Sequence, residues 1–178
     1  VVLPEQRTRL TDEEVIARCP WATTGRTHHR TPNIITSLEL DPAEMEKRNI
    51  HLQKKYAEIE ENEVRFEELH CEDAEYLIVA FGSCARIAQK AMEMAREEGI
   101  KVGLLRPITL WPFPSKAIAA RAAQVKGILT VELNAGQMVE DVRLAVECKV
   151  PVEHFGRLGG IVPDPDEVIT ALKEKLIK

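Results

Sequence analysis

From Asp73 to the end of the sequence, short apolar runs alternate with longer segments in which apolar residues recur at helical spacing. The run YLIVAF at 76–81 is almost continuously apolar, which is typical of a strand covered by helices on both faces. Three further runs of this kind are KVGLL at 101–105, GILTVEL at 127–133 and VPVEHFG at 150–156. The segments with helical spacing lie near 84–98, 115–126 and 136–148, and from Asp164 onward.

This βαβαβαβα order constrains the fold more than any other feature of the chain. Parallel strands joined by helices of this length need right-handed crossovers, which place helices on both faces of the sheet. We therefore predict an α/β fold with an open, mostly parallel sheet. The carboxyl ends of the strands share one edge, where ligands of such sheets bind. The loops expected at that edge are 82–84, 106–114, 134–136 and 156–160.

The part of the sequence before Asp73 lacks this alternation. Residues 1–41 contain three prolines and the polar stretch ATTGRTHHRTPN, which indicates an extended arm that packs on a neighbouring domain. Asp41 followed by Pro42 is a typical helix start, so a long helix is expected over about 42–69, with a coiled coil as an open alternative. The expected division is an arm and helical linker at 1–72 and an α/β domain at 73–178.

The net charge of −5 is carried by the first part of the chain. Residues 1–72 contain 10 Lys and Arg against 15 Asp and Glu, whereas residues 73–178 contain 14 of each. This distribution offers no basic stripe to nucleic acid. No apolar run approaches the roughly 20 residues that a membrane-spanning helix needs. The opening residues VVLPEQRTRLTDEEV lack a signal-peptide core and an initiating Met, so we expect a fragment or processed product in the cytoplasm.

The sequence contains four cysteines, Cys19, Cys71, Cys84 and Cys148. Their spacing does not match the pairs that bind zinc or iron–sulfur clusters. Cys84 and Cys148 fall in expected helices, where a free Cys usually packs as a small apolar residue, with a reactive thiol as the alternative. Adjacent His28 and His29 would point to opposite faces of an extended segment. No metal site is therefore expected.

Gly82 and Ser83 follow the first expected strand and form our candidate anion-binding loop. At a turn from strand to helix, free backbone N–H groups can face an anion, and Ser83 can cap the helix. The stretch lacks the complete G-x-G-x-x-G of dinucleotide sites and the G-K-[ST] of a P-loop, so a plain tight turn stays open. Gly159 and Gly160 are likewise interpreted first as a turn.

Trp111, Pro112, Phe113 and Pro114 form the densest cluster of aromatic residues and prolines in the sequence. Aromatic side chains held stiffly by two prolines can fill a pocket of a partner at a small entropic cost. The same residues could instead cover the core of their own domain. Both interpretations stay open, and the four residues are our interface candidates.

No catalytic residue is assigned. The spacing of the residues supports neither a Ser–His–Asp nor a Cys–His pair. Glu132, near the end of the third expected strand, is the one carboxylate worth testing as an acid–base group. His154 lies in an expected strand, where it is interpreted as packed or hydrogen-bonded.

Two long stretches carry a resemblance to a known family. The sequences GSCARIAQKAMEMAREEGIKVGLLRPITLWPFP and VELNAGQMVEDVRLAVECKVPVEHFGRLGG resemble the 2-oxoacid:ferredoxin oxidoreductases, at the end of their α subunit. The matching part is their second domain, which is similar to the C-terminal domain of transketolase. PWATTGR and the segment from NIITSLEL to FEEL resemble the linker after the thiamine-binding first domain. The phrases RPITLWPFP and NAGQMVEDVRLA resemble most closely the 2-oxoisovalerate and 2-oxoglutarate types.

The resemblance implies an anaerobic, multi-subunit enzyme that oxidatively decarboxylates a 2-oxoacid with coenzyme A and passes electrons to ferredoxin. It implies thiamine diphosphate, Mg²⁺ and iron–sulfur clusters in the intact enzyme, and none of them in this fragment. The fragment is then a non-catalytic domain that contacts another domain and other subunits. Two alternatives stay open, namely a module that binds a phosphate-bearing ligand such as coenzyme A, and a domain of a transketolase or 2-oxoacid dehydrogenase β subunit.

Overall fold

The computed structural model describes residues 9–21, 34 and 36–177. The chain divides into two compact units, Val1–Asn49 and Ile50–Lys178, and the sheet lies wholly in the second. His28 and His29 lie outside the described residues, as does part of the expected arm.

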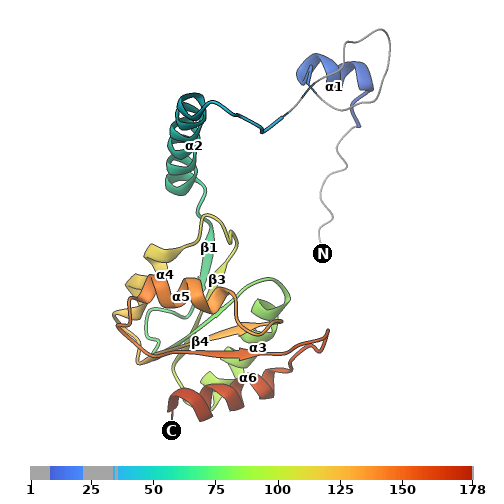
Figure 1. Ribbon diagram of the computed structural model, residues 1–178. Coiled ribbons are helices and arrows are strands. Elements are labelled where there is room, and N and C mark those ends of the chain that lie inside the picture. Colours follow the sequence, from blue (N-terminus) through green and yellow to red (C-terminus); the bar gives the residue numbers. More distant parts are fainter. Residues whose placement is uncertain (1–8, 22–33, 35, 178) are drawn as a thin grey trace. The chain divides into compact units, whose positions relative to one another are not determined.

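Two helices precede the sheet in the sequence. α1, Asp12–Arg18, begins with a capping box in which Thr11 and Glu14 exchange hydrogen bonds between side chain and backbone. α2 spans Pro42–Asn62 (Figure 1). The Asp41 carboxylate accepts hydrogen bonds from two backbone N–H groups of its first turn, at 2.8 and 3.2 Å. The expected start of the long helix is thereby confirmed.

The expected end of that helix was wrong. α2 stops at Asn62, and Phe66–Leu69 form a short strand, β1, instead of the last two helical turns. β1 pairs antiparallel with a strand of the sheet, so that Leu69 lies opposite Leu104. The hydrogen bonds of this pairing outweigh the helical pattern of the local sequence. The sheet therefore begins before Asp73, and the division of the chain at that residue stays a prediction.

Four parallel strands make up the rest of the sheet: β2 at Tyr76–Ala80, β3 at Val102–Pro107, β4 at Gly127–Glu132 and β5 at Val152–Gly156. The strand order is β1-β3-β2-β4-β5, with only β1 antiparallel. The register is regular, since Ile78 lies between Leu104 of β3 and Leu129 of β4. The predicted open, mostly parallel sheet is confirmed.

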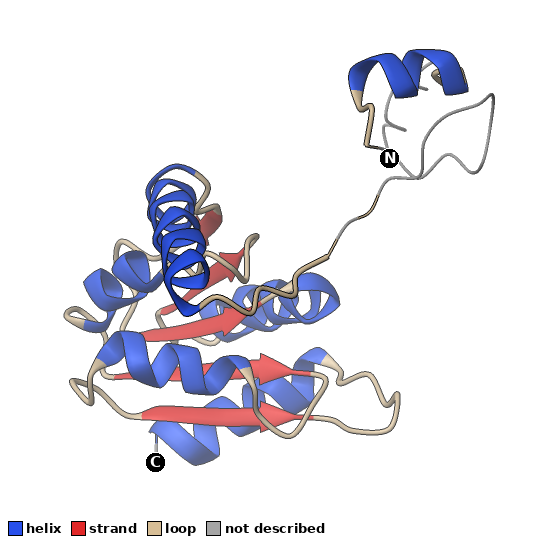
Figure 2. Cartoon of the chain, turned by 45° about the horizontal axis from the view of Figure 1, so that its top comes forward, coloured by secondary structure: helices blue, strands red, loops and turns tan. Residues whose placement is uncertain are grey.

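Helices cover both faces of this sheet (Figures 1 and 2). α3, Gly82–Glu97, and α6, Pro165–Leu172, pack on one face, and the π-helical turn Lys173–Ile177 continues α6. α4, Ser115–Ala122, and α5, Met138–Val146, pack on the other. Each face has its own apolar core, and each fully buried Leu or Ile contributes roughly 1.5 to 3 kcal/mol to folding.

An ion pair joins β1 to α4. The Arg121 guanidinium donates to both oxygens of Glu68, at 2.9 and 2.7 Å, and both side chains are largely covered. The bidentate hydrogen bond holds the pKa of the Glu68 carboxyl below its usual value, against the opposing effect of burial. It also raises the pKa of the Arg121 guanidinium.

The lowered pKa of Glu68 predicts a specific loss of stability in acid. A carboxyl whose pKa is lower in the folded state stabilises the fold above its unfolded pKa, and this contribution is lost as the pH falls through the folded pKa. Between pH 6 and pH 3 the wild-type chain should lose about 1 kcal/mol more unfolding free energy than Glu68→Gln. Urea denaturation at both pH values measures this difference. Equal losses of unfolding free energy in the two proteins would show that the Glu68–Arg121 pair does not contribute to stability.

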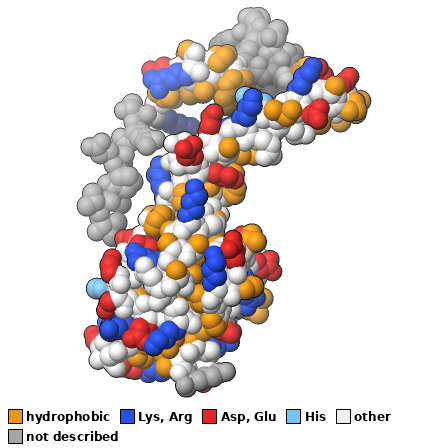
Figure 3. Space-filling model, turned by 90° about the vertical axis from the view of Figure 1, so that its left-hand side faces the viewer, with side chains coloured by type: hydrophobic (Ala, Val, Ile, Leu, Met, Phe, Trp, Pro, Cys, Tyr) orange, Lys and Arg blue, Asp and Glu red, His pale blue; other side chains and the backbone are white. Residues whose placement is uncertain are grey.

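The surface of the α/β unit mixes charges of both signs. On the face shown in Figure 3, basic and acidic side chains alternate with apolar ones and form no stripe of a single sign. Within the described ranges, no helix is both long and apolar enough to cross a membrane.

Candidate functional site

The carboxyl ends of the parallel strands meet at one edge of the sheet, as expected. Two of the helices that start there have contrasting N-termini. α5 has its first turn occupied by a carboxylate of the protein, whereas α3 has no side-chain cap. A helix N-terminus with free N–H groups attracts anions. At this edge, the N-terminus of α5 is thus occupied by a carboxylate of the chain itself, and the N-terminus of α3 is open.

The open site is a hollow at Gly82 and Ser83. Gly82 adopts φ +56°, a backbone conformation that favours glycine, and a Cβ at this position would meet no atom within 4 Å. Phe81 is the N-cap of α3, so the expectation that Ser83 caps this helix was wrong. Ser83 lies instead within the first turn and is exposed. The Ser83 hydroxyl therefore does not cap α3.

Two arginines adjoin these residues in a hollow of about 410 Å³. Arg86 is the fifth residue of α3, and no hydrogen bond or ion pair joins it to another described residue. Arg106 comes from β3, and its guanidinium lies 3.0 Å from the Glu67 carboxylate. The hollow therefore combines a free helix N-terminus with one unpaired and one paired cation. Neither arginine was a candidate from the sequence, although Arg86 follows Ser83 by three residues and Arg106 is the next-to-last residue of the adjacent strand.

Glu132 fills the other site. Its carboxylate is fully buried and accepts hydrogen bonds from the N–H groups of Gln137, Met138 and Val139, at 3.2, 2.8 and 3.0 Å. His154 Nδ1 lies 3.4 Å from the same carboxylate. Because both oxygens are engaged and shielded from water, Glu132 stabilises the start of α5. The structure thus gives Glu132 a structural role, and the acid–base role stays an untested prediction.

His154 of β5 contacts β4 and the loop that follows β4. Its Nδ1 lies 3.3 Å from the Thr130 hydroxyl and its Nε2 lies 3.3 Å from the Asn134 carbonyl oxygen. The Asn134 side chain in turn accepts a hydrogen bond of 2.8 Å from the Gly136 N–H. His154 is therefore packed and hydrogen-bonded, as interpreted from the sequence.

Two of the cysteines are buried thiols. Burial raises the pKa of the Cys71 thiol to about 11, and its Sγ lies 3.4 Å from the Leu104 carbonyl oxygen. Burial, followed by the charge of Glu132, raises the pKa of the Cys84 thiol. Both thiols are thus poor nucleophiles at neutral pH.

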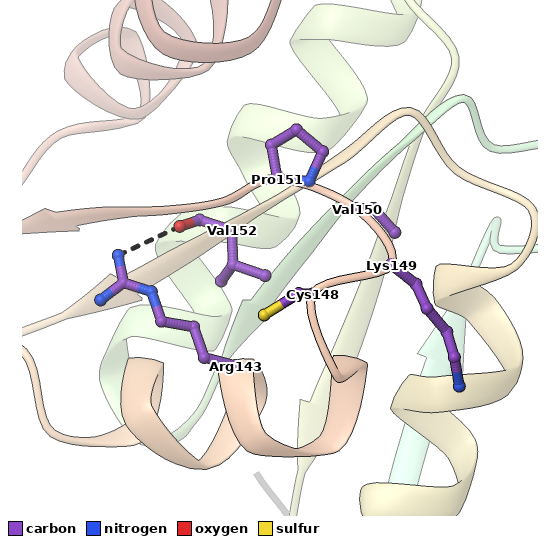
Figure 4. A pocket seen from close by; sticks show the side chains of 6 residues that line it. All are labelled: Arg143, Cys148, Lys149, Val150, Pro151 and Val152. Carbon is purple, nitrogen blue, oxygen red and sulfur yellow. Dashed lines mark hydrogen bonds between the residues drawn. The ribbon is translucent and has the colours of Figure 1, made fainter.

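Cys148 departs from the expectation of a buried helical cysteine. α5 ends at Val146, and Glu147 and Cys148 adopt φ of 53° and 61° as the chain turns toward β5. Cys148 is exposed and lines a pocket of about 440 Å³ (Figure 4). Arg143 in this pocket donates to the Val152 carbonyl at 3.1 Å. Among the described residues that line the pocket, none is a carboxylate or an imidazole, and Lys149 is paired with Glu147 at 2.9 Å.

The candidate interface loop is divided between core and surface. Pro112 and Pro114 are buried, and Phe113 packs against the core on the α4 face. Trp111 is 55% exposed, and its ring meets Tyr56 of α2 edge-on with centroids 5.5 Å apart. The two interpretations left open by the sequence thus apply to different residues, because only Trp111 is available to a partner.

No group of three or more His, Cys, Asp or Glu side chains suited to a metal ion occurs among the residues that the structure describes. The arrangement can therefore offer an anion-binding hollow and an apolar surface, both built on a rigid sheet.

Comparison with known proteins agrees with this architecture. Residues 74–168 match the family described as pyruvate:ferredoxin oxidoreductase core domain II. The chain is 46% identical to ketoisovalerate oxidoreductase subunit VorB of Methanothermobacter thermautotrophicus over 165 residues, covering 91% of this chain and 46% of the relative. It is 32% identical to 2-oxoglutarate synthase subunit KorA of Archaeoglobus fulgidus over 143 residues, covering 79% and 40%. The chain thus spans less than half the length of these curated relatives.

Solved structures share the fold. A 2-oxoglutarate:ferredoxin oxidoreductase from Magnetococcus marinus, with 2-oxoglutarate, coenzyme A and succinyl-CoA bound, superposes with a TM-score of 0.68 at 24% identity, covering 84% of this chain and 27% of that one. An inactive split-gene transketolase tetramer superposes with a TM-score of 0.55 at 21% identity, covering 64% and 41%. Since the family match extends over more than half of the sequence, this chain belongs to the pyruvate:ferredoxin oxidoreductase core domain II family.

Proposed function

We propose that this chain is a non-catalytic domain of a 2-oxoacid:ferredoxin oxidoreductase, of the 2-oxoisovalerate type, that helps to assemble the enzyme and to shape the surroundings of its active site. The observation that carries the proposal is the 46% identity to a ketoisovalerate oxidoreductase subunit over 91% of this chain. The enzyme would oxidatively decarboxylate its 2-oxoacid with coenzyme A and pass the electrons to ferredoxin. It would act in the cytoplasm.

The chemistry of the described residues favours a structural role rather than a catalytic one. The buried carboxylate of Glu132 is committed to the start of α5, and the pKa values of the Cys71 and Cys84 thiols are raised. We assign thiamine diphosphate, Mg²⁺ and the iron–sulfur clusters to other parts of the enzyme. In this chain, the sheet and its helices would hold the strand-end loops and the exposed Trp111 side chain in place.

Turnover by the chain alone tests this role. The purified 178-residue chain should not reduce viologen when a 2-oxoacid, coenzyme A, thiamine diphosphate and Mg²⁺ are supplied under anaerobic conditions. The positive control is the assembled enzyme in the same assay. Reduction of viologen by the chain without other subunits would contradict a non-catalytic role.

The hollow at Gly82 and Ser83 favours a second candidate, a module that binds a phosphate-bearing ligand such as coenzyme A. The uncapped start of α3 and the unpaired Arg86 place N–H groups and a cation at the same 410 Å³ hollow. The second glycine pair, Gly159 and Gly160, adopts positive φ in the loop after β5 and has open space around it.

Calorimetry with coenzyme A tests the second candidate. Micromolar binding should disappear in Ser83→Glu, because a carboxylate at the start of α3 repels a phosphate and occupies the hollow. Ser115→Glu is a matched control, since Ser115 is exposed at the first position of α4. Absence of heat with the wild-type chain, or equal loss in both variants, would count against the module.

A third candidate, a domain of a transketolase or of a 2-oxoacid dehydrogenase β subunit, is favoured only by the shared fold. The transketolase structure supports it at the level of topology. The electron acceptor of the intact complex separates the candidates, because only the oxidoreductase proposed above transfers electrons to ferredoxin.

A further inference from the structure

Five large apolar residues are exposed around the loop after β3. Each of Trp111, Ile108, Leu110, Phe66 and Tyr56 is between 38% and 55% exposed, and we call this set the Trp111 surface. Scattered exposed apolar residues are ordinary, but a gathered group that includes Trp, Tyr and Phe marks interaction sites. Of these five residues, only Trp111 was an interface candidate from the sequence.

A ring contact and a strand pairing place members of this set near one another. Tyr56 and Trp111 touch ring to ring, and Phe66 lies opposite Pro107 in the pairing of β1 with β3. Ile108 follows Pro107 directly. The Trp111 surface is therefore built from the end of α2, the start of β1 and one loop, all within the unit Ile50–Lys178.

Hydrogen bonds hold this surface in one conformation. The Arg65 carbonyl accepts from the N–H groups of Ile108 and Thr109, at 3.0 and 3.1 Å. The Thr109 hydroxyl accepts from the Arg65 N–H and donates to the Pro112 carbonyl, each at 2.9 Å. A surface that is already ordered loses little entropy when a partner docks.

Two arginines beside β1 and β3 are paired with acidic side chains. Arg65 lies 3.4 Å from Glu63, and Arg106 lies 3.0 Å from Glu67. Near the loop after β3, an occupant therefore need not neutralise these two cations. This arrangement favours an apolar protein surface over a nucleic acid or a charged small molecule.

We propose that the Trp111 surface docks the part of the oxidoreductase polypeptide that the relatives possess beyond the length of this chain. This inference rests on the proposed function. The chain covers 46% of the ketoisovalerate oxidoreductase subunit and matches a family named as the second domain of a core, so the relatives contain further polypeptide to occupy the surface. Trp111 is the anchor, since Trp and Tyr dominate the energies of such interfaces.

The proposal can be tested by hydroxyl-radical footprinting of the assembled, full-length enzyme, which measures the solvent exposure of each side chain. Trp111, Tyr56 and Phe66 should be oxidised about tenfold more slowly than their exposure in this structure implies, because the centre of an interface excludes water. Leu144, which is 79% exposed on α5, is the internal control and should be oxidised at its full rate. Full oxidation of the Trp111 surface in an active complex would overturn the proposal.

A variant in the full-length polypeptide gives a second readout. Leu110→Ser should increase proteolysis between this chain and the rest of the polypeptide by about 30-fold, as expected for loss of a major interface side chain. Leu144→Ser, a matched change on α5, should leave the rate unchanged. Equal rates in both variants would overturn the proposal, as would cross-links that join Trp111 surfaces of two copies. An assembly that shows the predicted protection but does not oxidise any 2-oxoacid would contradict the proposed function instead.

Discussion

Glu132→Ala is expected to destabilise the α/β unit by about 3 kcal/mol, because each buried N–H donor left without its acceptor costs about 1 to 3 kcal/mol. The substitution removes the acceptor for three backbone N–H groups at the start of α5, and it leaves His154 without its carboxylate neighbour. Buried donors without acceptors are costly. Urea denaturation of the purified chain, followed by far-UV circular dichroism at pH 7, measures the effect.

Glu140→Gln is the control for this prediction. Glu140 also lies in the first turn of α5, but it is exposed. Its substitution should change the unfolding free energy by less than about 0.5 kcal/mol. A similar small effect of Glu132→Ala would show that the buried carboxylate is not required for the start of α5.

Gly156→Ala should cost about 3 kcal/mol or more, because the new methyl group meets backbone that cannot move aside. A Cβ at Gly156 would overlap the Asn134 carbonyl oxygen and lie 2.6 Å from His154 Nε2. The same loop leads to the helix start that Glu132 stabilises. Thermal denaturation of the variant measures the loss.

Gly127→Ala, at the start of β4, provides the comparison. There the nearest atom to a new Cβ is Leu176 Cδ2, at 2.8 Å, which is the end of a flexible side chain. The cost should stay below about 1.5 kcal/mol. If Gly127→Ala and Gly156→Ala were equally destabilising, the close approach of the loop to β5 would not explain the role of Gly156.

The sheet was predictable from sequence because each parallel strand is marked locally. YLIVAF, for example, is apolar on both faces, which follows from the helices that cover it. β1 was not predictable in this way. Its sequence, FEEL, continues the acidic pattern of the preceding helix, and it becomes a strand only by pairing with residues about 40 positions later.

The candidate site was predictable only in part, because its contacts join distant residues. Gly82 was correctly placed at a strand end, yet nothing in the local sequence shows that Arg106 lines the same hollow. Glu132 was named as the one carboxylate worth testing because it lies near the end of a strand. The N–H groups that engage it follow five to seven residues later, so a carboxylate placed just before a helix start is the signal that could have indicated a cap.

The central claim is that this chain is part of a 2-oxoacid:ferredoxin oxidoreductase. The most direct measurement is the anaerobic purification of the complete native polypeptide with its bound subunits, followed by assays of viologen reduction with 2-oxoisovalerate, 2-oxoglutarate and pyruvate. We predict reduction that requires both a 2-oxoacid and coenzyme A, with 2-oxoisovalerate as the best substrate. A catalytically intact complex that reduces viologen with none of the three acids would contradict the claim.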